Sequence, residues 1–232
     1  MNIRNYFRML VDRINLSNII RREVNMLHVT KKHTGKMNGM ISLSTSTRDN
    51  PFCQSMQKTD AICKKCFAKN CERMYGDRKM PLEERVVQSW KKNGDILSTE
   101  KNVSLLVNAS YFRFHSFGEL INKQHALNFF SICRQNPDTT FALWTKRPNL
   151  VEVERKPANM ILIYSSPKIN VVSEFPEGFN KVFTVFETKY INDNNININC
   201  ENSCISCRKC YTHNDITFIN EKMKRERLWD KK

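Results

Sequence analysis

Eight of the nine cysteines of this 232-residue chain fall into two groups. The first group contains Cys53, Cys63, Cys66 and Cys71, and the second contains Cys200, Cys204, Cys207 and Cys210. Thiolates that follow one another at such short spacing can meet at one soft metal centre, whereas structural cysteines are usually scattered. The sequence therefore predicts a metal centre whose candidate ligands are these eight cysteines.

The second group favours an iron–sulfur cluster. Two residues separate Cys204 from Cys207 and Cys207 from Cys210, and three thiolates on one loop can hold three corners of a 4Fe–4S cluster. Zinc prefers paired Cys-x2-Cys knuckles and is the alternative metal. The fourth ligand is either Cys200 or a residue of the first group. We therefore expect one or two 4Fe–4S clusters.

The spacing from Cys200 to Cys207 also matches the bare motif of radical S-adenosylmethionine enzymes. That motif normally follows an early strand and has an aromatic residue before its last cysteine. Here the match lies near the C-terminus and has Ser206 in the aromatic place. Because such spacing arises easily in a cysteine-rich loop, we discount this match.

The first group has a looser pattern. Cys63 and Cys66 lie one turn apart on a predicted helix and face one side. Cys71 comes five residues later, so it is either a ligand or a small buried apolar residue. Cys133, in an apolar helix, is interpreted as a core residue.

Polar side chains also lie at the ends of predicted strands. Alternation along the strand that ends near residue 115 places Arg113 and His115 on one face. Lys146 and Arg147 follow the next strand, and Ser165 ends the one after it. Because α/β folds bind ligands at the carboxyl ends of parallel strands, these residues predict a site at one mouth of the sheet.

This site suits an anion such as phosphate. His115 and Glu119 are the candidate catalytic residues for proton transfer, and the candidate ligand-binding residues are Arg113, Lys146, Arg147 and Ser165. The alternative is that Arg113 and His115 are a buried polar pair that braces the sheet. For Glu119 and Ser165 the structural role is the stronger interpretation.

The elements that position these residues alternate between strands and helices. Strands are predicted at 40–46, 103–107, 111–115, 140–145, 160–165 and 182–187, and helices at 63–74, 81–92 and 118–133. The strands are apolar on both faces, as buried parallel strands are. We expect an α/β fold with a mainly parallel sheet, as a partial or complete TIM-like barrel, with an open α/β sheet second.

Three parts are expected along the chain. Residues 1–34 form a basic amphipathic helical segment, residues 35–215 an α/β domain that carries both cysteine groups, and residues 216–232 a basic C-terminal helix. No stretch approaches the roughly 20 apolar residues of a membrane span, and charged residues interrupt the N-terminal apolar runs. We therefore expect a cytoplasmic protein with reduced thiols and no membrane partner.

The chain has a formal net charge of +15 and a pI of about 9.5. A charge of this size predicts a polyanionic partner, with nucleic acid first. The alternative is AT-rich coding, which by itself enriches a chain in Lys, Asn and Ile.

The chain resembles the phage gene-product-88 domain family over about residues 35 to 211. The matching pieces are Gly35–Gly39, Asn50-Pro-Phe-Cys53, Cys63-Lys-Lys-Cys66-Phe67-Ala68, Arg113 to Glu119, Thr145-Lys146 and Cys204 to Tyr211. The family tends to have Tyr, Asp and Trp where this chain has Phe67, Glu119 and Tyr211. The resemblance implies a cluster-binding α/β protein of phage or mobile-element origin, in the cytoplasm of the host cell, and it implies no particular reaction.

The sequence thus favours an iron–sulfur α/β protein, as an enzyme or a redox module that acts on nucleic acid or a phosphorylated ligand. The alternative is a zinc-stapled nucleic-acid-binding regulator without catalysis.

Overall fold

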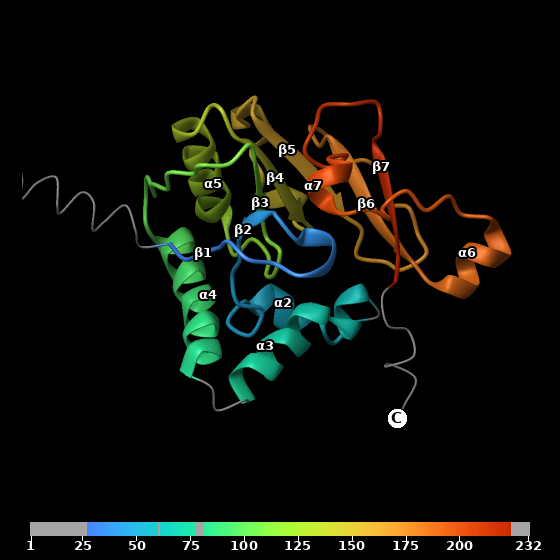
Figure 1. Cartoon of the computed structure of the whole chain (residues 1–232), viewed down its shortest axis with the longest axis horizontal. Helices are drawn as coiled ribbons and strands as arrows, with labels where there is room; N and C mark the ends of the chain where they lie inside the picture. The colour runs from blue at the N-terminus through green and yellow to red at the C-terminus, as the bar shows by residue number, and fades with distance from the viewer. Residues whose placement is uncertain (1–26, 60, 78–80, 224–232) are drawn as a thin grey trace, which may run out of the picture.

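The apolar runs in the middle of the chain form one mostly parallel sheet (Figure 1). The computed structural model describes residues 27–59, 61–77 and 81–223. The strands are β1 (Val29–Thr30), β2 (Ile41–Leu43), β3 (Tyr111–Phe114), β4 (Thr140–Thr145), β5 (Met160–Ser165), β6 (Lys181–Phe186) and β7 (Phe218–Lys222). They pair in chain order, β1 antiparallel to β2 and all the others parallel.

This topology confirms the predicted α/β fold. Pairing in chain order is the order of strands in a barrel, but the described strands form an open row that ends at β1 and β7. Closure into a barrel is therefore not confirmed.

Helices and short turns surround the sheet. They are η1 (Gly35–Met37), α2 (Pro51–Met56), η2 (Ile62–Lys65), α3 (Phe67–Asp77), α4 (Pro81–Thr99), α5 (Lys123–Gln135), η3 (Pro148–Leu150), η4 (Val153–Arg155), α6 (Thr188–Asn194) and α7 (Cys204–Cys207). Figure 1 shows α2 and α3 below one end of the sheet and α7 in front of it. None of the described helices is long and apolar enough to cross a membrane.

The main core lies between one face of the sheet and helices α4 and α5. Phe114 of β3 stacks on Phe129 of α5 and on Phe141 of β4, with ring centroids 4.0 and 5.2 Å apart. All three rings are fully buried, and each contributes about 1.5–3 kcal/mol by leaving water. This packing fixes β3 and β4 side by side, so that the ends of both strands reach the same edge of the sheet.

A smaller core covers the opposite face. It contains Ala142 and Trp144 of β4, Ile161 and Ile163 of β5, and Tyr211. Cys204 and Cys210 pack against this cluster. The second cysteine segment is therefore part of the fold's packing and lies against the sheet.

Helix α4 runs through Asn93 and Gly94, where the sequence predicted its end. Asn93 is fully buried, accepts a hydrogen bond from the His28 amide at 2.8 Å and donates to the carbonyls of His28 and Ser44 at 2.9 Å. These tertiary hydrogen bonds outweigh the low helix propensity of an Asn-Gly pair.

Two other predicted elements need correction. Residues 103–107, predicted as a strand, have no regular structure, and their backbone is held by the Asn128, Gln135 and Asn136 side chains. The helix predicted over residues 216–232 is wrong for Phe218–Lys222, because these residues form β7 and pair with β6. The helical segment predicted within residues 1–34 falls mainly outside the described residues, as do residues 224–232.

Candidate metal centres and active site

The loop after β2 carries the first cysteine group to the carboxyl edge of the sheet. Asn50 caps helix α2, with Oδ1 accepting from the amides of Phe52 at 3.0 Å and Cys53 at 3.4 Å. Its Nδ2 donates to the carbonyl of Glu119 at 2.8 Å, and the whole side chain is buried. One residue thus ties the Cys53 backbone to the segment after β3.

The rest of this group is anchored from α3. Glu72 is fully buried and accepts hydrogen bonds from Ser46 Oγ at 3.1 Å, Thr47 N at 2.6 Å and Arg48 N at 3.3 Å. On the other side, the amide of Ile62 donates to the carbonyl of Pro167, beyond β5, at 2.7 Å. The Glu72 hydrogen bonds tie the cysteine segment to the loop after β2, and the Ile62 hydrogen bond ties it to the loop after β5.

Three thiols of the first group gather at this edge. Burial raises the pKa of Cys53, as do Glu119, Cys66 and Cys63, while Lys146 lowers it. Burial also raises the pKa of Cys63, with Lys146, Cys66 and Glu119 as its charged neighbours. The structure therefore brings Cys53, Cys63 and Cys66 together beside Glu119 and Lys146. Cys71 lies further along, in the second turn of α3.

Glu119 is held in place by three donors. Its Oε1 accepts from the Leu120 amide at 2.8 Å and from Thr145 Oγ1 at 2.5 Å, and its Oε2 accepts from the Lys146 amide at 2.7 Å. Burial raises the pKa of Glu119, opposed by Lys146 and by these hydrogen bonds. The carboxyl group is thus fixed at the ends of β3 and β4.

Lys146 and Arg147, the cations predicted at this edge of the sheet, lie near the Glu119 carboxyl group. Lys146 Nζ donates to Ser165 Oγ at 3.1 Å. Arg147 donates to the carbonyls of Leu120 and Ile121 at 2.9 Å, and its guanidinium lies 4.8 Å from the centroid of the Phe52 ring. Lys146 and Ser165 are therefore part of one polar site, whereas Arg147 braces the loops that carry it.

The second group forms a separate site on the face of the sheet. Cys204 and Cys207 are the first and last residues of α7, and Arg208 ends this turn in a left-handed conformation. Burial raises the pKa of Cys210 to about 12, Arg113 lowers it, and Cys200, Cys204 and Cys207 raise it further. Cys210 thus lies close enough to each of the other three thiols of this group to act on it.

Cations flank the second group. Lys36 of η1 donates to the carbonyl of Cys200, lies 3.7 Å from the Cys200 Sγ and pairs with Glu221 at 2.9 Å. Arg113 lies over the Trp144 ring, 3.8 Å from its centroid. In the described part of the chain, no three Cys, His, Asp or Glu side chains already form an arrangement that could hold a metal ion. A cluster binds each thiolate through a different iron, so its ligands need not converge on one point.

Arg113 and His115 have different neighbours, although strand alternation predicts a common face. His115 has a φ of 60°, which ends the strand and breaks the alternation. Its ring lies 5.2 Å from both His125 and Phe129 of α5, on the side of the main core. Arg113 instead belongs to the face with the second cysteine group, and its Nε donates to the His115 carbonyl at 3.4 Å.

We expect His115 to make folding pH-dependent. Burial, opposed by the Trp144 backbone and assisted by the charges of Arg113 and Lys146, lowers its pKa to about 3. Below the ordinary value of 6.5 the unfolded chain binds a proton that the folded chain does not, so stability falls as pH drops from 6.5 towards 3. The loss reaches about 4 kcal/mol. Denaturant unfolding at several pH values measures it.

The variant His115→Asn is the reference for that measurement, because Asn tolerates a positive φ. His125, whose pKa is lowered by burial and by His115, is present in both proteins, so the difference in pH slope reports His115 together with its effect on His125. Equal slopes for the two proteins would contradict a buried neutral His115.

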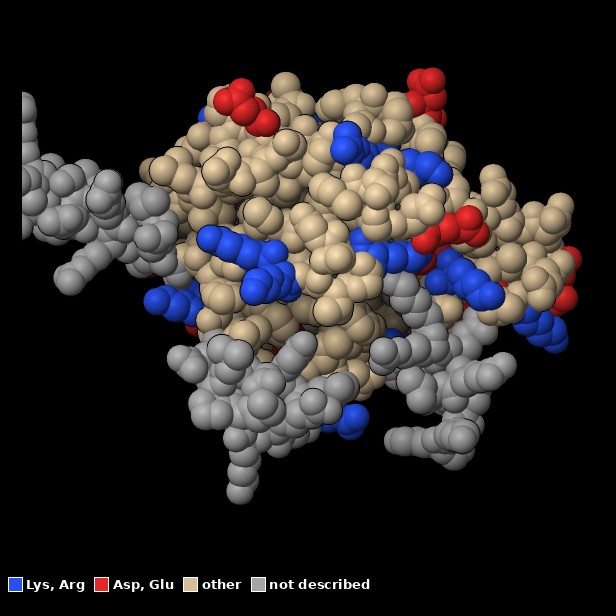
Figure 2. Space-filling model, in the orientation of Figure 1, with Lys and Arg blue, Asp and Glu red and all other residues tan. Residues whose placement is uncertain are grey.

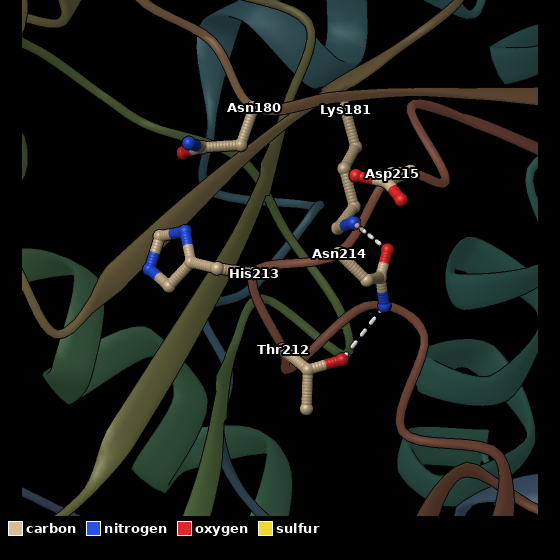
Figure 3. Close-up of a pocket in the computed structure, with 6 residues that line it drawn as sticks. All are labelled: Asn180, Lys181, Thr212, His213, Asn214 and Asp215. Carbon is tan, nitrogen blue, oxygen red and sulfur yellow. Dashed lines mark hydrogen bonds between the residues drawn. The ribbon is translucent and has the colours of Figure 1, made fainter.

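A hollow of about 340 Å³ lies at the opposite, amino-terminal edge of the sheet (Figure 3). There Lys181, the first residue of β6, donates to Asn214 Oδ1 at 2.8 Å and to the Ile216 carbonyl at 2.7 Å. Asn214 in turn donates to Thr212 at 2.7 Å. These contacts give Lys181 a bracing role, and no cysteine lines the hollow.

Two residues that shape the sites were not predicted from the sequence. The sequence could have identified Asn50 as a helix cap, since Asn before Pro is a common start of a helix. No sequence pattern could have identified Lys36, because 164 residues separate it from Cys200 and only the fold brings the two together.

Comparison with known proteins gives one match. The family model described as Gene product 88 matches residues 19–230, which is most of the chain. No curated protein matches the chain, and no solved structure does.

Proposed function

The chain belongs to the Gene product 88 family, and we propose that it is a redox enzyme that holds one iron–sulfur cluster at each of its two cysteine groups. The observation that carries the proposal is the arrangement of the thiols. Three thiols lie together beside Glu119 and Lys146 at the carboxyl edge of the sheet. In the second group, Cys204 and Cys210 pack against the face of the sheet, and Cys210 lies near the other three thiols.

The charges around the thiols support clusters as the occupants. A cluster held by thiolates is anionic, and its reduction potential depends on nearby charge and on hydrogen bonds to sulfur. Lys146 lies beside the first group, and Lys36 and Arg113 lie beside the second. These cations offset the negative charge that the thiolates acquire when metal displaces their protons.

The two centres differ in what they can do. The second group has four thiols and so can ligate every iron of a 4Fe–4S cluster, which suits electron transfer. The first group lies where α/β folds bind ligands, next to the buried carboxyl of Glu119 and the ammonium of Lys146. We propose that substrate binds at the first centre and that the second centre relays electrons to it.

Zinc at the four-thiol site is the alternative, since four thiolates also satisfy tetrahedral zinc. Analysis of iron, acid-labile sulfide and zinc after anaerobic purification separates the two. Iron and sulfide in comparable amounts support the proposal. A colourless, folded protein with stoichiometric zinc would replace it by a zinc-stapled regulator.

We further propose nucleic acid as the substrate class, on the strength of the net charge of +15. Lys and Arg side chains occur at several places across the face in Figure 2. We expect binding to single- and double-stranded DNA or RNA that weakens about 10³–10⁵-fold between 50 and 200 mM salt if six to ten phosphates are contacted.

Fluorescence anisotropy with labelled oligonucleotides, repeated over a salt series, measures that slope. A mixture of nucleosides, which carry no phosphate, is the control and should not compete with the labelled oligonucleotide for binding. Undetectable binding at low salt would leave the charge as a consequence of coding composition and remove nucleic acid as the substrate.

A further inference from the structure

The first cysteine group has the placement that the discounted radical-enzyme motif of the second group lacks. Cys53 follows β2, which is the first parallel strand of the sheet. The aromatic residue here, Phe67, follows Cys66, whereas in the motif it precedes the last cysteine, so the position in the fold, and not the motif, carries the comparison. Three thiolates ligate three irons of a 4Fe–4S cluster and leave the fourth iron open. An open iron accepts a ligand from outside the protein.

The groups beside these thiols are one anion and one cation that do not pair directly. Lys146 Nζ bonds the Ser165 hydroxyl at 3.1 Å, and the Glu119 carboxyl is bonded by two amides and a hydroxyl. Oε2 of Glu119 accepts one of these bonds and has a further lone pair. The site therefore offers one acceptor for an ammonium group and one donor for a carboxylate.

An α-amino acid carries this pair of groups at the right separation to bind one metal through both. Once its ammonium group has lost a proton to solvent, the amine nitrogen and one carboxylate oxygen can chelate the open iron, while a remaining N–H donates to Glu119 and the other carboxylate oxygen accepts from Lys146. A cluster supplies single electrons, and a sulfonium is an amino-acid side chain that a single electron cleaves. These features together select a sulfonium amino acid.

We propose that the first cysteine group binds S-adenosylmethionine, with Cys53, Cys63 and Cys66 as cluster ligands and with Glu119 and Lys146 as partners of its amino and carboxylate groups. The inference rests on the proposed function, because it requires a cluster at this group. It adds the co-substrate and the reaction type.

A low-potential one-electron donor, such as dithionite or a reduced flavoprotein, reduces the cluster by one electron. That electron enters the sulfonium, the bond between sulfur and the 5′ carbon breaks, and sulfur keeps an electron pair as methionine. The 5′-deoxyadenosyl radical takes a hydrogen atom from the substrate, or from buffer when no substrate is present, and becomes 5′-deoxyadenosine.

The test uses the full chain, reconstituted anaerobically and reduced with dithionite. Addition of S-adenosylmethionine should change the electron paramagnetic resonance signal of the reduced cluster, and chromatography should detect 5′-deoxyadenosine. The variant Cys204→Ala/Cys207→Ala should still show the spectral change, because its first cluster is intact and dithionite reduces that cluster directly, without the second centre as a relay. Loss of the spectral change in that variant would mean that S-adenosylmethionine does not bind at the first centre, which would overturn the inference.

Lys146→Met should weaken binding of S-adenosylmethionine by at least about tenfold, as loss of a charge-assisted hydrogen bond does, while iron content stays constant. The Lys146 amide still bonds Glu119 in this variant. Lys101→Met, at an exposed lysine, is the matched control. Glu119→Gln is the second variant, with the same expected loss. Unchanged affinity in both would overturn the assignment of these partners.

Cys71→Ala tests the three-ligand assignment. We expect it to keep the iron of the first centre and its response to S-adenosylmethionine. Loss of that iron would make Cys71 the fourth ligand, close the open iron and overturn the inference.

Failure of the inference differs from failure of the proposed function. If iron is present at the first group but neither the spectrum nor 5′-deoxyadenosine responds, only the inference is overturned. If the first group holds no iron, both are overturned.

Discussion

Replacing Cys204 and Cys207 together with alanine should remove about half of the iron and acid-labile sulfide from the anaerobically purified protein. The two thiols belong to the four-thiol group, and alanine offers no ligand in their place. The complementary variant, Cys63→Ala/Cys66→Ala, should remove the other half. Iron and sulfide analysis with absorption spectroscopy measures both.

Cys133→Ala is the control for this pair of variants. Cys133 is fully buried in the main core and belongs to neither group, so its removal should leave the metal content unchanged. If either double variant loses all iron, the two groups share one centre. If neither loses iron, the cysteines are not ligands, and the proposed function fails.

Loss of the second cluster should also loosen the fold locally. Cys204 and Cys210 pack on the small core that contains Trp144 and Tyr211. Metal binding and folding are coupled, since an unfolded chain has no assembled site. If the proposed cluster is bound, we therefore expect the face of the sheet opposite α5 to depend on the metal more than the main core does.

The sequence predicts the central strands well because their residues favour a buried strand over other local structures. The apolar runs predict β4 and β5 at their observed bounds, Thr140–Thr145 and Met160–Ser165. Both are apolar on both faces and bounded by turn residues, as buried parallel strands are. Local pattern and tertiary environment agree at these strands, so the pattern suffices.

Prediction fails where a distant contact overrides the local pattern. Asn93 continues a helix because the backbone of His28 and Ser44 needs its amide. His115 leaves the face of Arg113 because the chain turns left-handed there. The approach of Cys53 to Glu119 depends on Asn50, and no spacing rule links residues 69 positions apart.

The largest effect of a single methyl group is expected at Gly118. Gly118 has a φ of +87°, and a Cβ there would lie 2.1 Å from Thr45 Oγ1 and 2.4 Å from the Thr45 carbonyl oxygen. The loops after β2 and β3 are bonded at this place, since the Thr45 amide donates to the Phe117 carbonyl at 3.2 Å. Gly118→Ala must therefore push apart the two loops that carry Cys53 and Glu119.

We expect Gly118→Ala to lower the free energy of unfolding by about 2–5 kcal/mol, from left-handed strain of about 1–2 kcal/mol and overpacking of about 1–3 kcal/mol. Gly35→Ala separates the two terms, because Gly35 has a φ of +63° and nothing within 4 Å of its added Cβ. That control should show the strain alone. Urea unfolding of both variants measures the difference, and equal losses would mean that Thr45 yields and that the loop contact does not fix the site.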